Sequence, residues 1–340
     1  MKRRTLITSL LAAGSCSALG SFAKIPPKSP ALLTTSGPVR LGAYLGAGCK
    51  GTERLPAYQE WLGRKVDQML EFISWEVLAK HQGWAVKCWR TSGQESVVFS
   101  LPMLPPDRSR KLAGGAQGKF DELFSRYAEL LISRGYGSSV IRIGWEFNAA
   151  WYAWDASKDP EAWIAYWRRI VTAMRKTPGA NFRYDWCPAA AAKGFNAEKA
   201  YPGDDYVDIV GLDFYNMPVG QKDDSPQGRW DARMKMQHGL GWQRDFARSR
   251  GKPMSLPEWG TGVHKKWGGP ADDPYFIEQM AAWMNSNPYV YQNYWEYWSK
   301  QFNTRLSGGG QPQAAAAYLR HFGGDRSAGS GLQSPARTMA

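Results

Sequence analysis

Two glutamates that each follow an apolar run and stand beside a tryptophan are the residues of this chain best suited to chemistry. The segment 141–148 reads Ile-Arg-Ile-Gly-Trp-Glu-Phe-Asn, and 255–260 reads Ser-Leu-Pro-Glu-Trp-Gly. A carboxylate at the end of a buried strand is costly unless something uses it. Glycosidases need one carboxyl group as acid/base and a second as nucleophile, with flat rings to hold a sugar. Glu146 and Glu258 therefore predict glycosidase chemistry.

Strand-like and helix-like patterns alternate along the chain around these glutamates, with eight strand candidates. Alternation of this kind is typical of parallel strands joined by crossover helices, and eight such strands close a barrel with its chemistry at their C-terminal ends. We predict an α/β fold, a (β/α)8 TIM barrel in a single domain at 38–322. Strands are expected at 39–45, 72–75, 96–101, 139–147, 181–187, 207–215, 253–259 and 290–298, and helices at 58–71, 120–133, 160–175, 231–250, 274–285 and 314–322.

The residues before Glu146 suggest a partner for the two carboxylates. The period of two along a strand puts Arg142, Gly144 and Glu146 on one face, and Gly144 leaves room there. Arg142 is then expected beneath the carboxylates, where its charge keeps one of them ionised. The alternative is a structural Arg–Glu ion pair without chemistry, which the second glutamate at another strand end disfavours.

Three motifs in this order resemble glycoside hydrolase family 26, which comprises mainly endo-β-1,4-mannanases and belongs to clan A of the (β/α)8 glycosidases. The first is 142–148 with the aromatic residues that follow it, and it resembles the fourth-strand motif. The second is 201–211 with Asp213 and Tyr215, which resembles the sixth-strand segment. The third, 257–260, resembles the seventh-strand nucleophile motif. The resemblance covers roughly 38–300.

The resemblance implies a role for each matching residue. Glu146 is the expected acid/base and Glu258 the expected nucleophile, with Arg142 supporting Glu258 and Tyr215 hydrogen-bonded to it. No metal and no cofactor are expected. The other predicted substrate-binding residues are Trp145, Asn148, Trp151, Trp154, Trp259 and Trp295. Trp295 is the expected aromatic platform, with Tyr294 and Trp298 as alternatives for that place.

The chain departs from the family pattern just before the acid/base, where Trp145 replaces the usual histidine. A tryptophan can only donate one N–H and stack. Because both glutamates are present, the predicted function is that of a retaining endo-β-glycosidase, acting on β-1,4-mannan or a mannan-like polymer. The alternatives are a hydrolase of another, acidic bacterial exopolysaccharide and a non-catalytic carbohydrate-binding barrel.

Several other polar residues near strand ends have a structural interpretation beside a functional one. Asp185 and Asp213 are candidates for partners of the catalytic groups. Glu296 is a rival carboxylate that lacks the Pro-Glu-Trp-Gly context. His264 is expected on a loop surface, and Cys187 is expected as a packed thiol.

The N-terminal region predicts export to the periplasm or the extracellular space. Residues 1–23 combine the basic Lys2, Arg3 and Arg4 with an apolar stretch too short to span a bilayer, and 3–7 resembles a twin-arginine signal. The Pro/Ser/Thr-rich stretch 24–37 is expected to be a linker, and the Gly/Ser-rich 323–340 a disordered tail.

Composition limits the partners. The formal net charge is +13 without a Lys/Arg-rich run, which disfavours a nucleic-acid groove and leaves either a solvated basic surface or a field that attracts an acidic polysaccharide. We expect a monomer with a polysaccharide substrate, no nucleic acid and no stable membrane insertion. Some of the 17 tryptophans are expected to line a saccharide cleft. Cys49 and Cys88 are the expected disulfide pair.

Overall fold

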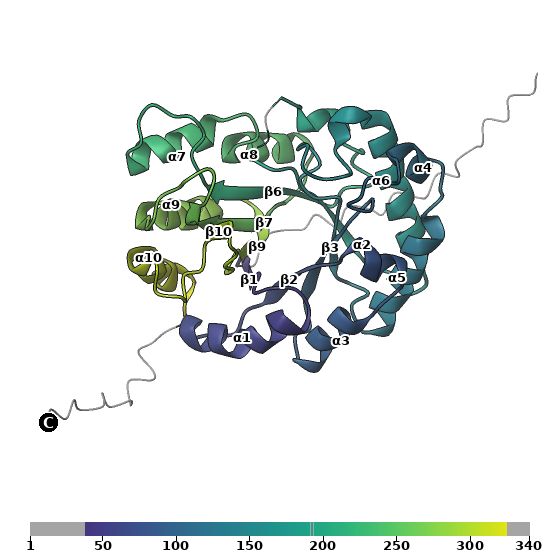
Figure 1. Ribbon diagram of the computed structural model, residues 1–340, viewed down its shortest axis with the longest axis horizontal. Coiled ribbons are helices and arrows are strands. Elements are labelled where there is room, and N and C mark those ends of the chain that lie inside the picture. The colour runs from purple at the N-terminus through teal and green to yellow at the C-terminus, as the bar shows by residue number, and fades with distance from the viewer. Residues whose placement is uncertain (1–37, 191, 193, 325–340) are drawn as a thin grey trace, which may run out of the picture. The chain divides into compact units, whose positions relative to one another are not determined.

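The chain folds as a closed barrel of eight parallel strands (Figure 1). The computed structural model describes residues 38–190, 192 and 194–324, all within the unit Leu33–Ala340. The first strand pairs with the last, which closes the barrel and confirms the predicted (β/α)8 fold. In chain order the barrel strands are β1 (Arg40–Ala43), β2 (Gln68–Phe72), β3 (Val97–Leu101), β4 (Val140–Ile143), β5 (Arg183–Trp186), β6 (Ile209–Asn216), β7 (Met254–Thr261) and β9 (Tyr289–Tyr294).

Helices surround the barrel strands, as Figure 1 shows. Two short antiparallel strands, β8 (Val263–His264) and β10 (Phe302–Asn303), lie outside the barrel sheet. The helices are α1 (Cys49–Leu62), α2 (Trp75–Ala79), α3 (Trp84–Thr91), α4 (Leu112–Ala116), α5 (Asp121–Ser133), α6 (Pro160–Arg175), α7 (Pro226–Lys235), α8 (Leu240–Ser249), α9 (Pro274–Asn285) and α10 (Pro312–Phe322), with 3₁₀ turns η1 (Ala156–Lys158) and η2 (Ala197–Ala200).

Helix α6 shows how local sequence fixes an element. Asp159 caps its first turn by accepting a hydrogen bond from the backbone N–H of Ala162 at 2.9 Å, and Pro160 occupies the first turn, where a missing N–H costs nothing. Its buried face returns every three or four residues, so the helix packs one apolar stripe on the barrel. That stripe comprises Trp163, Tyr166, Trp167, Ile170, Val171 and Met174.

Some predicted elements are wrong. The helix expected at 58–71 lies earlier, at α1, and the last residues of that range belong to β2 rather than to the strand expected at 72–75. The single helix expected at 231–250 is two helices, α7 and α8. They separate near Gly239, where a Cβ would lie 2.1 Å from the backbone oxygen of Arg233, so the chain turns at a residue without a side chain.

Two apolar layers hold the barrel together. The larger packs the outer faces of the strands against the helices. The smaller gathers residues whose alternation along the strands turns them inward. Polar residues further along the same strand faces continue inside the barrel, so the apolar packing gives way to a buried polar layer toward the C-terminal ends of the strands. The inward apolar group comprises Tyr44, Leu70, Val98, Val140, Ile209 and Tyr291.

A disulfide joins α1 to α3 through Cys49 and Cys88, as the sequence predicts. The residues next to the two cysteines, Gly48 and Trp89, both bind the carboxylate of Glu71. Glu71 accepts hydrogen bonds from the N–H of Gly48 at 2.6 Å and from the indole of Trp89 at 2.5 Å. Burial raises the pKa of Glu71 to about 7. The β1–α1 connection is thus fixed to both β2 and α3.

The predicted signal peptide, the linker and residues 325–340 of the predicted tail lie outside the described residues. None of the helices within the described ranges has the length and apolarity needed to cross a membrane.

Reduction of the Cys49–Cys88 disulfide is expected to lower the free energy of unfolding. The bridge closes a loop with a sequence separation of 39, for which the constrained unfolded chain gives about 2–4 kcal/mol. Denaturant unfolding of the wild type with and without dithiothreitol measures this difference. The Cys49→Ala/Cys88→Ala variant is the control, and its free energy of unfolding should be the same with and without dithiothreitol. An equal free energy of unfolding for the wild type in both conditions would contradict the expectation.

Candidate active site

Arg142 and two carboxylates form a charged centre inside the barrel. Arg142 is fully buried on β4, and its Nη2 contacts Asp213 of β6 and lies 2.6 Å from Oε1 of Glu258 on β7. Asp213 and Glu258 are neighbours in the β6–β7 ladder. Burial alone lowers the pKa of Arg142, but the Asp213 carboxylate, with smaller contributions from Cys187 and Glu258, raises it well above its ordinary value. The guanidinium is therefore a permanent cation at the base of the site.

Both carboxylate oxygens of Glu258 are oriented. Oε1 faces the guanidinium of Arg142, and Oε2 accepts a hydrogen bond from the hydroxyl of Tyr215 at 2.8 Å. The side chain of Glu258 is only 8% exposed. A cation on one oxygen and a hydroxyl donor on the other restrict the rotation of the carboxylate.

Glu146 lies in a turn just after β4, not within the strand expected at 139–147. Its backbone has φ of 53°, in the left-handed region, and its N–H donates to the backbone oxygen of Cys187 at 2.8 Å. Gly144 also has a left-handed φ of 52°, and a Cβ there would lie 2.4 Å from Sδ of Met103. The tight turn aims the glutamate side chain, and its Oε2 accepts a hydrogen bond from the indole of Trp151 at 2.8 Å.

The environment of Glu146 favours its protonated form. Burial is the largest cause, the negative charge of Glu258 adds to it, and together they raise the pKa of Glu146 to about 8 against the opposing hydrogen bond from Trp151 and the charge of Arg142. Glu146 thus holds a proton at neutral pH, whereas Glu258 has a cation beside it. One carboxyl of the pair suits an acid and the other a nucleophile.

Aromatic rings line one side of this centre. Trp295, which follows β9, stacks on Tyr44 with ring centroids 4.1 Å apart and an interplanar angle of 23°. The same indole meets Phe72 edge-on at 5.7 Å and Tyr215 edge-on at 6.3 Å. Trp151, by contrast, is 49% exposed and touches Glu146. Flat surfaces therefore flank both glutamates.

Comparisons with known proteins agree with this geometry. Residues 138–234 match the model of glycosyl hydrolase family 26. The predicted resemblance to glycoside hydrolase family 26 is confirmed. A curated relative, endoglucanase H of Acetivibrio thermocellus, is 24% identical over 307 residues; the match covers 84% of this chain and 30% of the relative, so this chain spans under a third of its length.

Solved structures share the fold at low sequence identity. The family 26 β-mannanase BoMan26A of Bacteroides ovatus superposes with a TM-score of 0.60 at 16% identity, covering 85% of this chain and 91% of that one. The YdhT protein of Bacillus subtilis gives a TM-score of 0.58 at 18% identity, covering 84% and 86%.

Trp145, at the position where family 26 usually has histidine, is nearly buried. Its indole donates to the hydroxyl of Tyr152 at 2.8 Å, and its ring lies 5.7 Å from the guanidinium carbon of Arg142. The indole N–H is therefore engaged within the protein. Trp145 covers Arg142 from one side and adds to the aromatic surroundings of the site.

Three residues predicted to bind substrate are buried and make contacts within the protein. Asn148 is buried and exchanges hydrogen bonds with the backbone of Ala189. Trp154 is buried and donates to the backbone oxygen of Trp145 at 2.8 Å. Trp259 is fully buried with its N–H on Gln292 and packs among rings on the helix side of the sheet, away from Glu258. Substrate binding by these three residues stays a prediction, and the contacts of each side chain in the structure are with the protein itself.

The sequence alone did not single out Tyr44 and Phe72, which surround Trp295, because an aromatic residue at a strand end is equally typical of a core. Asp213 was left between two interpretations, and the structure brings it onto Arg142. Glu296, the rival carboxylate, instead accepts hydrogen bonds from the backbone N–H groups of Leu306 and Ser307, which ties the end of β9 to the segment before α10.

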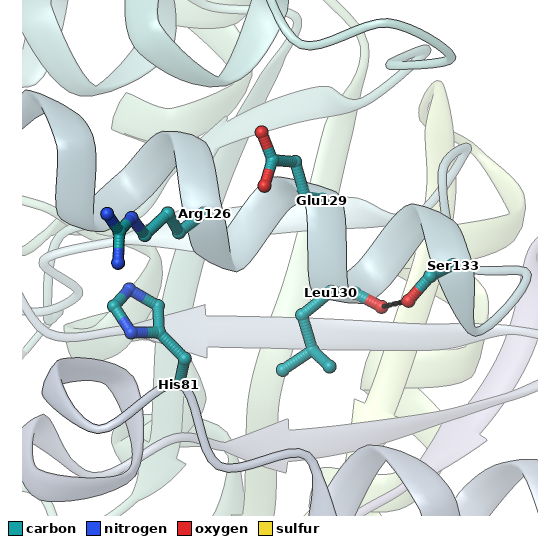
Figure 2. A pocket seen from close by; sticks show the side chains of 5 residues that line it. All are labelled: His81, Arg126, Glu129, Leu130 and Ser133. Carbon is teal, nitrogen blue, oxygen red and sulfur yellow. Dashed lines mark hydrogen bonds between the residues drawn. The ribbon is translucent and has the colours of Figure 1, made fainter.

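Other features of the described residues lie apart from this centre. Figure 2 shows a surface hollow on the outer helices, in which Ser133 donates to the backbone oxygen of Leu130 and His81 approaches α5. Neither Glu146 nor Glu258 is among the residues that line it. Within the described ranges, no group of three or more His, Cys, Asp or Glu side chains is arranged to hold a metal ion.

The Trp151→Phe variant is expected to raise the pKa of Glu146 further, because the indole hydrogen bond stabilises the ionised carboxylate more than the protonated one. Loss of a hydrogen bond to a charged group at a half-exposed position corresponds to about one pH unit. The alkaline limb of the pH profile of hydrolysis measures this shift toward higher pH. A variant with an unmoved alkaline limb would show that Trp151 does not set the acidity of Glu146.

Proposed function

We propose that this protein is a retaining endo-β-glycosidase that hydrolyses β-1,4-mannan or a mannan-like polymer. The observation that carries the proposal is the contrast between the two glutamates. Glu258 is oriented by Arg142 and Tyr215, whereas burial and the charge of Glu258 raise the pKa of Glu146 to about 8. Retaining glycosidases need this division between a charged nucleophile and a protonated acid.

The reaction is a double displacement. Glu146 donates its proton to the glycosidic oxygen while a carboxylate oxygen of Glu258 attacks the anomeric carbon, so the C–O bond to the leaving sugar breaks as the glycosyl-enzyme ester forms. Glu146, now ionised, then removes a proton from water, whose oxygen attacks the anomeric carbon and releases Glu258. This sequence requires carboxyl groups about 5–5.5 Å apart.

The choice of a mannan-like polymer is supported by the mannanases among the similar structures. Trp151 and Trp295 supply exposed or half-buried rings on which sugars stack. Export of the protein is part of the proposal, supported by the signal-like sequence at 1–23.

A second candidate is hydrolysis of an acidic polysaccharide, favoured by the net charge of +13 and by Trp145 in place of histidine. A non-catalytic carbohydrate-binding barrel is disfavoured, because Arg142 and Tyr215 orient a carboxylate that mere binding does not need.

Wild-type protein incubated with a panel of β-mannan, glucomannan, β-glucan and acidic polysaccharides is expected to release new reducing ends from the mannans. The Glu258→Ala variant should lose about 10⁴-fold or more of this activity, as removal of a covalent nucleophile does elsewhere. Glu129→Ala, on the outer helix α5, is the matched control and should behave as wild type. Hydrolysis by Glu258→Ala at a near-normal rate would refute the assigned role.

The first product anomer distinguishes the mechanism. Proton NMR of a mannan-oligosaccharide digest, recorded before mutarotation, should show the β-anomer first because two inversions restore the configuration. Initial appearance of the α-anomer would mean an inverting enzyme and a wider separation of the carboxyl groups.

A further inference from the structure

Exposed apolar side chains gather beside the proposed active site. Of the five large hydrophobic residues exposed in the described part of the chain, Val263, Trp267 and Trp298 are 44%, 52% and 57% exposed and lie in the segments that follow β7 and β9. A fourth, Trp151, touches Glu146. Exposed tryptophans clustered at a mouth of the barrel indicate a binding surface rather than chance exposure.

These residues belong to a small folded unit that we call the β8–β10 rim, residues 263–268 and 298–303. His264 pairs with Phe302 and Val263 with Asn303 across the two short strands. Isolated bridges extend the unit on both sides, from His264 to Gly268 and from Trp298 to Asn303. The rim is therefore held by backbone hydrogen bonds and is not a loose loop.

The exposed ring of Trp267 is fixed from behind. The imidazole of His264 stacks on it with centroids 4.1 Å apart and an angle of 18°. Nδ1 of that imidazole accepts hydrogen bonds from the N–H groups of Lys266 and Trp267 at 3.1 and 3.2 Å, so the histidine is itself oriented. A ring held in place before binding loses little entropy when a sugar stacks on it.

Aromatic contacts connect the rim to the nucleophile. His264 lies 5.6 Å from the ring of Phe302, and Phe302 lies 5.2 Å from the ring of Tyr215. Tyr215 in turn donates its hydroxyl to Glu258. A polymer that occupies the site at Glu258 and extends across Tyr215 and Phe302 would reach Trp267.

The rim is also basic. Lys265, Lys266 and Lys300 are exposed, and none of them forms an ion pair with another described residue. The ammonium group of Lys266 lies 5.7 Å from the ring centre of Trp267. Unpaired lysines around a stacking surface match a sugar that carries a negative charge.

We propose that the β8–β10 rim is a distal subsite for carboxylate-bearing sugar units of the polysaccharide. Trp267 and Trp298 stack on the sugar rings, and the three lysines contact the carboxylates. The proposal rests on the proposed glycosidase function and adds a preference for an acidic polymer. It also assigns part of the positive net charge of the chain, that of the three rim lysines, to substrate binding.

The test compares glucomannan with carboxymethyl-glucomannan, which share a backbone and differ in carboxylates. Binding is measured by affinity gel electrophoresis with the Glu258→Gln variant, and hydrolysis by reducing ends with the wild type. We expect carboxymethyl-glucomannan to bind more tightly than glucomannan. Addition of 0.3 M NaCl should remove most of this difference in affinity, because the Debye length then falls to about 6 Å and exposed charges are screened. Trp267→Ala should weaken binding of both polymers.

Substitution of the rim lysines tests whether their charges cause the preference for the carboxylated polymer. Lys265→Gln/Lys266→Gln is expected to lower the preference for the carboxylated polymer by about two- to fivefold per lysine, which is the range for exposed charge pairs. Lys87→Gln/Lys176→Gln removes the same charge elsewhere and should leave the preference unchanged. Equal loss in both double variants would overturn the rim as the acidic subsite.

Failure of the rim and failure of the proposed function give different results. If the wild type hydrolyses glucomannan while the rim variants bind both polymers as wild type does, the rim proposal falls and the glycosidase stands. If no polymer yields reducing ends but the preference depends on the rim lysines, the rim stands and the catalytic proposal falls.

Discussion

A single buried cation, Arg142, is the constraint on which the site depends. Removing a guanidinium from water costs several kcal/mol unless carboxylates and hydrogen bonds replace the lost solvent. Asp213 and Glu258 contact one of its nitrogens and Ser100 lies 3.2 Å from another, so strands β3, β4, β6 and β7 all contribute to one charge. The barrel therefore cannot close correctly with these strands out of register, and the register that stabilises Arg142 also orients Glu258.

The charge of Glu258 then acts on Glu146. Because Arg142 is shared between Asp213 and Glu258, it does not fully offset the negative charge near Glu146, whose pKa is raised to about 8 by burial and by Glu258. Burial also raises the pKa of Asp213 well above its ordinary value, against the opposing charge of Arg142. Asp213 has no place in the double displacement itself, yet it contacts the same guanidinium nitrogen as Glu258 and so helps to hold Arg142 beneath the nucleophile.

The barrel and the two glutamates were predictable because both leave a pattern along the chain. Buried parallel strands read as apolar runs, and a carboxylate at the end of such a run is rare enough to stand out. The role of a tryptophan was not predictable from its neighbours, since Trp151 and Trp259 both lie near a glutamate but only Trp151 is exposed. The period of two does hold information here, because Trp259 follows Glu258 and so points to the opposite face of β7. The turn at 144–146 was not predicted, because Gly144 is the only residue of that segment whose type indicates a turn.

That turn positions the side chain of Glu146, which the site also requires. A non-glycine residue in the left-handed region costs about 1–3 kcal/mol and persists only when its surroundings hold it there. The N–H of Glu146 is held by Cys187, and Asn148 two residues later is bonded to Ala189, so the turn after β4 is attached to the chain that leaves β5. Had β4 continued to residue 147, alternation would have fixed the direction of Glu146 by the sheet. The turn instead sets the acid independently of the strand, with the buried Asn148 supplying the anchor that stabilises it.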